Sequence, residues 1–119
     1  MKAYTDIEQS KKLAEILPIE SADMFYDQYG VIRIGNPKER YSDYHQLPVW
    51  SLAALLEHLP YEITDKEGTI RFFELYRGYR NQYHILYTGA DEDIEGEYYD
   101  NFVDACYEMI LKLHEFKML

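Results

Sequence analysis

The sequence predicts an α+β fold in which a three-stranded antiparallel meander packs against helices, in the order α-(ββ)-α-βββ-α. Three observations lead to this class. Residues 61–88 contain three strand-like runs separated by turn residues, and residues 98–117 show the periodicity of an amphipathic helix. The 119 residues, of which 47% are hydrophobic, suffice for one core. We therefore expect residues 1–119 to form a single domain.

A capping-box pattern marks the start of the first expected helix. Thr5 is followed three residues later by Glu8, and the hydroxyl and carboxylate of this pattern satisfy the first free backbone N–H groups. Pro18 cannot continue a helix, because its ring removes a donor and clashes with the preceding turn. We therefore expect a helix over residues 6–17.

The segment after this helix contains two short strand-like runs. Residues 24–26 and 31–34 flank a turn-like stretch that ends in Gly30, so a small hairpin is expected there. Residues 35–46 are mostly polar and contain several charged side chains. They are expected to form an exposed loop.

An apolar segment then predicts a buried helix over residues 48–59. Pro48 suits the first turn of a helix, and the apolar residues that follow it cover most of the helix circumference. Pro60 ends the pattern.

The meander comprises the runs 61–63, 69–77 and 82–88, joined by turns at 65–68 and 78–81. Its alternation is ambiguous, because Ile70, Phe72 and Tyr76 share one face while Phe73 and Leu75 share the other. Both faces are therefore partly apolar. One is expected to be covered by helices and the other by a partner, or both by the chain itself, and one residue of register decides which.

The last expected helix spans residues 98–117. Its apolar side chains recur at alternating steps of four and three, which makes one continuous apolar stripe along the helix. The members of the stripe are Phe102, Cys106, Met109, Leu113 and Phe116.

The chain is acidic, with 22 Asp and Glu against 12 Lys and Arg and a net charge of -10. Most of the excess lies in residues 61–119, and residues 81–111 contain neither Lys nor Arg. Such a field repels phosphate backbones and anionic lipid, which argues against direct nucleic-acid binding and against membrane binding.

Cysteine usage and apolar runs indicate the compartment. Cys106 is the only cysteine, so no internal disulfide can form, and a reducing compartment fits best. The longest apolar run, residues 49–56, is far shorter than the roughly 20 residues that a membrane span needs. No signal-peptide core follows the N-terminus. We expect a cytoplasmic protein.

Neither a catalytic, a cofactor-binding nor a metal site is expected. Residues 91–96 imitate the first half of a calcium loop, but the twelfth position, which should supply a bidentate Glu, is Phe102. The four histidines come from four different expected elements, without ligand spacing. Cys106 belongs to the apolar stripe of its helix and is expected in the core.

The tyrosines give the strongest functional signal. Thirteen of the 119 residues are tyrosine, and they cannot all be buried with their hydroxyls satisfied. Tyrosine is enriched at protein interfaces, so exposed tyrosines of the meander are candidates for contacting another protein or a second copy of this chain. The candidate protein-binding residues are Tyr76, Tyr79, Tyr83, His84 and Tyr87.

Three segments, residues 1–18, 50–56 and 100–113, resemble a family of short proteins from gut anaerobic bacteria and their prophages or mobile elements. The resemblance implies an accessory protein of a phage or mobile element. It implies no particular activity, cofactor or catalytic residue.

Three functional hypotheses follow from the sequence. The first is a non-enzymatic interaction module that binds another protein through exposed tyrosines of the meander. The second is an acidic nucleic-acid mimic that inhibits a DNA-binding protein, since residues 81–111 carry acids without bases. The third is a small-ligand binder or hydrolase assembled from His84, tyrosines and carboxylates of several elements.

Overall fold

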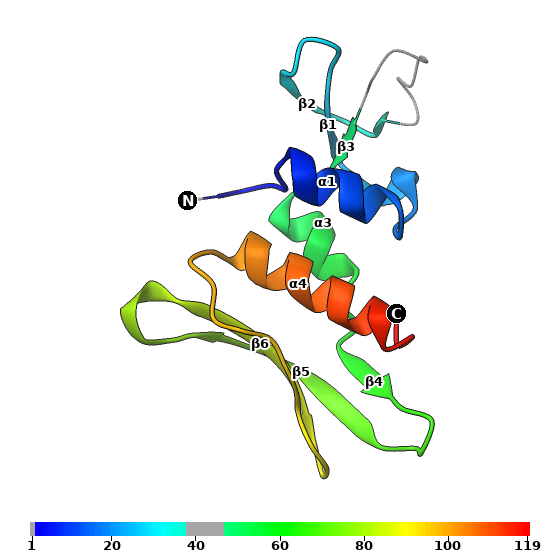
Figure 1. The fold of residues 1–119 in the computed structure, drawn as a ribbon, viewed down its shortest axis with the longest axis vertical. Coiled ribbons are helices and arrows are strands. Elements are labelled where there is room, and N and C mark those ends of the chain that lie inside the picture. Colours follow the sequence, from blue (N-terminus) through cyan, green and yellow to red (C-terminus); the bar gives the residue numbers. More distant parts are fainter. Residues whose placement is uncertain (1, 38–46) are drawn as a thin grey trace. The chain divides into compact units, whose positions relative to one another are not determined.

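The computed structural model describes residues 2–37 and 47–119, and Figure 1 shows its elements. The described residues form helices and two antiparallel sheets, which confirms the α+β class. They divide into two compact units, which we call the N-terminal unit (residues 2–55) and the C-terminal unit (residues 56–119). The expectation of a single domain stays a prediction. In the part of the chain that is described, no helix has the length and apolar character to cross a membrane.

The first helix, α1 (Ile7–Ala14), begins with a capping box one residue later than expected. The Asp6 carboxylate accepts a hydrogen bond from the Gln9 backbone N–H, and the Gln9 side chain accepts one from the Asp6 N–H. The prediction that Thr5 and Glu8 form the box was wrong. Asp and Thr both cap helices, so the pattern alone fits either position.

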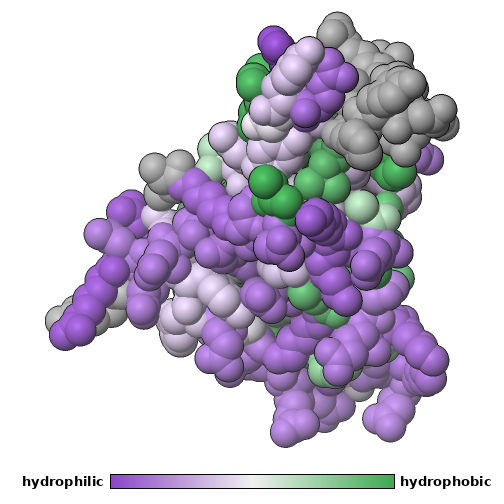
Figure 2. Space-filling model, turned by 45° about the horizontal axis from the view of Figure 1, so that its top comes forward, coloured by the Kyte–Doolittle hydropathy of each residue, from purple (hydrophilic) through white to green (hydrophobic). Residues whose placement is uncertain are grey.

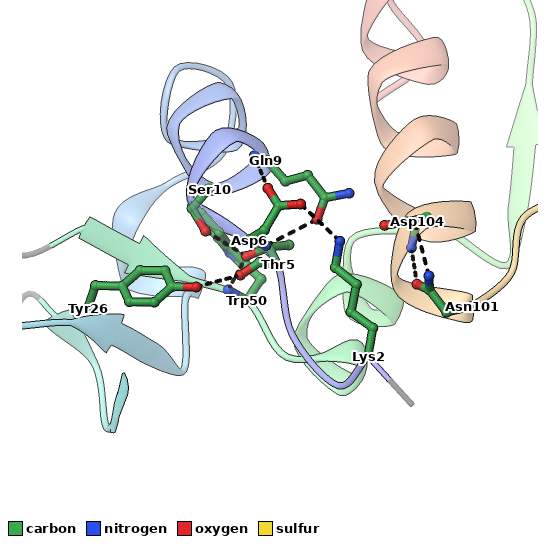
Figure 3. Close-up of polar contacts among 9 residues, drawn as sticks. All are labelled: Lys2, Thr5, Asp6, Gln9, Ser10, Tyr26, Trp50, Asn101 and Asp104. Atoms are coloured by element: carbon green, nitrogen blue, oxygen red, sulfur yellow. Dashed lines mark hydrogen bonds and ion pairs between the residues drawn. The ribbon is translucent and has the colours of Figure 1, made fainter. Parts of the chain in front are cut away.

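Thr5 is used inside the N-terminal unit instead (Figure 3). Its side chain is fully buried, and its hydroxyl lies 2.8 Å from the Ser10 hydroxyl. The same hydroxyl accepts a hydrogen bond of 3.1 Å from the backbone N–H of Trp50. Trp50 is fully buried too, and its indole N–H donates to the Ser21 hydroxyl at 3.0 Å. Buried polar atoms therefore join segments that lie far apart in the sequence.

A three-stranded sheet completes the N-terminal unit, after the short 3₁₀ helix η1 (Ile19–Ser21). Its strands lie in the order β2-β1-β3. They are β1 (Met24–Tyr26), β2 (Ile32–Ile34) and β3 (Leu47–Val49). The β1–β2 hairpin agrees with the sequence prediction, and the Asp27 carboxylate accepts hydrogen bonds from the N–H groups of Tyr29 and Val31 in its turn. Most of the expected loop over 35–46 lies outside the described residues.

The helix predicted over residues 48–59 is shorter in the structure. The structure has α3 at Leu52–Glu57, whereas residues 48–59 were expected to be helical. Pro48 instead lies opposite Phe25 in the sheet. The helix begins after Ser51, whose hydroxyl accepts a hydrogen bond from the Ala54 N–H, as an N-cap residue does. Proline is tolerated in an edge strand, as β3 is, and also in a first helical turn, so a pairing partner distant in sequence decides between them.

The C-terminal unit contains a four-stranded antiparallel sheet in the order β4-β5-β6-β7. Its strands are β4 (Glu62–Thr64), β5 (Ile70–Arg77), β6 (Tyr83–Gly89) and β7 (Ile94–Glu95). The first three form the predicted meander. The fourth, β7, was not predicted. The short 3₁₀ turn η2 (Tyr79–Asn81) joins β5 to β6, with Arg80 and Asn81 at φ values of 60° and 59°.

The last helix, α4 (Phe102–Glu115), covers one face of this sheet (Figure 1). It begins four residues later than expected, because Asn101 is its N-cap and accepts a hydrogen bond from the Asp104 N–H (Figure 3). The residues before it are extended, and the Tyr99 backbone pairs with that of Tyr83. Three members of the predicted apolar stripe, Cys106, Met109 and Leu113, are fully buried, whereas Phe116 is the C-cap and is 46% exposed.

Strand alternation decides which side chains face α4. The Tyr83 ring lies 3.9 Å from the Phe102 ring at the start of α4, so Tyr83, Ile85 and Tyr87 of β6 point towards the helix. Their cross-strand partners on β5 are Arg77, Leu75 and Phe73, and the last of these contacts the Tyr87 ring at 5.7 Å. The remaining residues of both strands point to the opposite side.

The molecular surface is mainly polar in the view of Figure 2, where hydrophilic residues (purple) outnumber hydrophobic ones (green). This agrees with the 29% of charged residues in the sequence. Apolar side chains that gather on a surface of this kind are therefore informative.

Candidate functional site: an open aromatic face

The sheet of the C-terminal unit has a face turned away from α4, which we call the open face. In Figure 1 no helix of this unit covers that side of β5 and β6. The pairing registers assign residues to it from four strands. They are Glu62, Thr64, Ile70, Phe72, Glu74, Tyr76, His84, Leu86, Thr88 and Glu95.

Large apolar side chains are exposed on the open face and at its borders. Tyr61 borders β4, with its ring 6.4 Å from the Phe72 ring, and Tyr98 lies over His84. Their exposed fractions are 76% for Tyr61, 45% for Ile70, 46% for Phe72, 48% for Tyr76 and 57% for Tyr98. The printed ring contacts form two groups on this face, Tyr61 with Phe72 and Tyr76 and Tyr98 with His84. Exposed apolar side chains that gather in this way mark interaction surfaces on otherwise polar proteins.

His84 lies beneath the Tyr98 ring and is only 6% exposed. Its ring centroid is 4.4 Å from that of Tyr98, with 30° between the planes, and 6.4 Å from that of Tyr76, its cross-strand partner. The Nε2 atom of His84 is buried and has no hydrogen-bond partner among the described residues. A buried polar atom without a partner costs free energy, and a group that bonded it would remove that cost.

The open face is negatively charged. The Tyr76 hydroxyl donates a hydrogen bond of 3.0 Å to the Glu74 carboxylate, and this bond, together with the carboxylate charge, raises the pKa of Tyr76. The charge of Asp93 contributes to the same pKa increase. The registers add Glu62 and Glu95, and they assign neither Lys nor Arg to the open face.

The structure separates the five predicted binding residues. Tyr76 and His84 belong to the open face. Tyr83 is 3% exposed and Tyr87 is fully buried, both on the face covered by α4, so the expectation that they form an exposed surface was wrong. The Tyr87 hydroxyl donates to the Pro60 carbonyl at 2.6 Å, and burial raises its pKa. Tyr79 lies in η2, and its side chain is not among those described.

Sequence reasoning did not name four exposed side chains of the site: Tyr61, Ile70, Phe72 and Tyr98. Phe72 was placed on the same face as Tyr76 but was not named as a binding residue. Tyr98 was expected to begin the last helix, whereas it lies in the extended segment before Asn101. The usable signal was the period of two in residues 70–76, which predicts a common face for Phe72 and Tyr76.

Calcium-loop geometry is not seen at residues 91–96. Asp91 accepts a hydrogen bond from the Thr69 hydroxyl at 3.0 Å, and Ile94–Glu95 form β7 instead of wrapping round an ion. Among the residues described, no three His, Cys, Asp or Glu side chains gather as metal ligands do. His45 lies outside the described residues. His58 is half-buried and its pKa is lowered by burial, while His114 is exposed on α4.

His84 lines none of three hollows found in the C-terminal unit. One of about 450 Å³ lies between the β4–β5 turn and the end of α4, bounded by residues such as Thr64, Lys66 and Phe116. Burial raises the pKa of the Cys106 thiol to about 12, so this thiol is not an activated nucleophile. The open face is thus the described surface whose geometry best fits a function.

Comparisons of the chain with protein-family models, with curated proteins and with solved structures gave no match. The resemblance of three segments to proteins of prophages and mobile elements therefore stays a prediction. The geometry of the open face is the remaining indication of function.

Proposed function

We propose that this protein is a non-enzymatic protein-interaction module that binds its partner through the open face. One observation carries the proposal: exposed aromatic side chains, among them Phe72, Tyr76 and Tyr98, lie together on a sheet face that α4 leaves uncovered. The expected role in a phage or mobile element is part of the proposal and is supported by the sequence resemblance alone.

The chemistry of the open face supports binding to a protein. Tyrosine and phenylalanine offer large contact areas and few side-chain torsions to order, which is why aromatic residues dominate the energetically important positions of interfaces. Removing one such anchor at the centre of an interface typically costs about 2 kcal/mol or more, a factor of roughly 30 in affinity. The central position of Phe72, between Tyr61 and the opposite residue Thr88, makes it the best single probe.

A comparative affinity capture tests the proposal. Tagged wild-type protein, the Phe72→Glu variant and the Tyr29→Ala variant are incubated with lysate of the source organism, and the retained proteins are identified. Tyr29 is 79% exposed and belongs to the N-terminal unit, so its variant removes an exposed aromatic side chain elsewhere. Circular dichroism establishes that all three proteins are folded.

We expect a protein that wild type and Tyr29→Ala retain and that Phe72→Glu loses. Sedimentation of the purified proteins tests whether the partner is a second copy of this chain. In that case Phe72→Glu sediments as a smaller species than wild type. The proposal fails if Phe72→Glu retains the same proteins as wild type and has the same sedimentation coefficient.

A further inference from the structure

Building on the proposed function, we propose that the partner of the open face is a basic protein segment, in which Arg or Lys side chains alternate with apolar ones. An aromatic surface alone does not determine the charge of its partner. It rests on the placement of charges, on the exposed rings and on His84.

Strand alternation sorts the charges of the sheet between its two faces. Glu62, Glu74 and Glu95 lie on the open face by register. Both arginines of β5 have the opposite parity. By register the open face therefore carries carboxylates and no Lys or Arg of these four strands, which favours a cationic partner.

The two β5 arginines are also held by other groups. Arg71 makes an ion pair with Asp65 at 2.9 Å, and its Nε donates to the Glu92 carbonyl at 2.8 Å. Arg77 donates to the Asn81 side chain at 2.9 Å, and its guanidinium lies 5.9 Å from the centre of the Tyr83 ring. Both arginines are therefore engaged on the covered face.

The exposed rings suit cations as well as apolar groups. A guanidinium or ammonium within about 6 Å of a tyrosine ring centre is attracted to the ring face, by about 0.5–1 kcal/mol at exposed sites. Tyr76 presents such a ring, and the Glu74 carboxylate is bonded to the Tyr76 hydroxyl. An arginine of the partner can thus lie on a ring while its N–H groups face a carboxylate.

The Nε2 atom of His84 favours a partner that carries a hydrogen-bond donor. In the tautomer that carries its proton on Nδ1, the unpartnered Nε2 is a hydrogen-bond acceptor. Arginine and lysine side chains are donors only, so a basic segment satisfies this atom when it displaces the Tyr98 ring from above it. A carboxylate would be repelled by Glu74 and could not donate. Basic surfaces are typical of nucleic-acid-binding proteins, the partner class of the acidic-mimic hypothesis.

Binding of three synthetic peptides of equal length tests the inference. In the first, Arg alternates with Leu and Trp; in the second, Gln replaces each Arg; in the third, Glu replaces each Arg. Fluorescence anisotropy measures the affinity of each labelled peptide for the full chain at 50 and 300 mM salt. We expect the basic peptide to bind at least tenfold more tightly than the other two, and more weakly at high salt.

Charge-matched variants separate the open face from the net charge. Glu62→Gln with Glu74→Gln removes two charges from the open face, and Glu8→Gln with Glu15→Gln removes two exposed charges from α1 and its C-cap. We expect the first pair to weaken basic-peptide binding about 5-fold to 10-fold and the second to change it less than 2-fold, since only the first pair belongs to the open face. Equal losses in both pairs would overturn the inference.

The same peptides distinguish failure of the inference from failure of the proposed function. If the Gln or Glu peptide binds best, and Phe72→Glu abolishes that binding, the interaction module stands and the basic partner is wrong. If Phe72→Glu changes the binding of none of the three peptides, the open face does not bind them and the basic partner is wrong. The interaction module itself fails only if Phe72→Glu also retains the same proteins as wild type in the affinity capture and has the same sedimentation coefficient.

Discussion

The Tyr98 ring lies over the His84 ring, with 4.4 Å between the ring centroids and 30° between their planes. The position of Tyr98 is set by the backbone next to it, since the Tyr99 N–H donates to the Tyr83 carbonyl at 2.9 Å and the Tyr83 N–H donates to the Tyr99 carbonyl at 2.7 Å. A buried imidazole is thus shielded by an exposed phenol, and moving one side chain uncovers the other.

Replacing Tyr98 by alanine is expected to expose the His84 imidazole with little loss of stability. The ring pair contributes about 0.5–1.5 kcal/mol, so the variant remains folded. Diethyl pyrocarbonate should modify His84 severalfold faster in Tyr98→Ala than in wild type, as followed by mass spectrometry of the peptide that contains His84. Tyr29→Ala is the control and should leave the rate unchanged. Equal rates in all three proteins would show that Tyr98 does not shield His84.

The buried thiol of Cys106 is expected to make the fold less stable at alkaline pH. Burial raises the pKa of this thiol from 9.0 to about 12, so the unfolded chain loses the proton at a lower pH than the folded chain. The stabilising contribution is complete below pH 9.0 and is lost as the pH rises towards about 12.

Urea denaturation between pH 7 and 10.5 measures this effect. The free energy of unfolding of wild type should fall above pH 9, and Cys106→Ala should fall less steeply. At pH 8 the native thiol should not react with Ellman's reagent, whereas the thiol of the urea-unfolded chain should react fully. A native thiol that reacts as fast as the unfolded one would contradict the burial of Cys106.

The ion pair of Asp65 with Arg71 is expected to contribute to stability at neutral pH and to lose that contribution in acid. The hydrogen bond from the Arg71 guanidinium lowers the pKa of Asp65 below 3.8, and the N–H groups of Thr69 and Glu67 add to the effect. The contribution is present above pH 3.8 and is lost as the pH falls through the lower pKa of the folded state.

Asp65→Asn is the test, with Glu67→Gln as the control because it removes one exposed charge from the same turn. We expect Asp65→Asn to be less stable than wild type at pH 7 and to show a smaller decline between pH 5 and 3. Denaturation curves at each pH report the difference. A decline as large as that of wild type would remove Asp65 as its source.

The hydroxyl of Thr5 is expected to matter more for stability than its methyl group. Thr5→Val keeps the shape but removes the acceptor of the Trp50 N–H and the partner of the Ser10 hydroxyl, which are buried. Leaving such groups unsatisfied costs about 1–3 kcal/mol. Thr69→Val removes a hydroxyl bonded to the exposed Asp91 and should cost less than about 1 kcal/mol. Thermal unfolding of both variants compares the two costs, and equal values would refute a special role of Thr5.

Local signals in the sequence predicted the elements whose pairing is local. The β1–β2 hairpin and the β4–β5–β6 meander pair neighbours in the chain, so turn residues and alternation suffice to place them. The stripe of α4 is also local, and Cys106, Met109 and Leu113 are buried as expected. Strand β3 could not be predicted in this way, because Pro48 pairs with Phe25 across 23 positions of the sequence.

Only part of the candidate site could be predicted, because the faces of a sheet also depend on pairing between strands. Residues 76, 79, 83 and 87 are all tyrosine, and composition treats them alike. Only the register, in which Tyr76 lies opposite His84 and Arg77 opposite Tyr83, sends Tyr76 to the open face and Tyr83 and Tyr87 to the covered one. Sheet register depends on contacts between strands, so the sequence of one strand does not determine it.

The alternation along β5 separates what holds the sheet together from what it presents to a partner. Arg71, Phe73 and Leu75 point to the side of the helix, while Ile70, Phe72, Glu74 and Tyr76 point away from it. Mutations at the four even-numbered positions can therefore change partner preference during evolution without repacking the interior. Related proteins that share this fold are expected to diverge most at these four positions, so a new binding specificity requires only a few substitutions in a single strand.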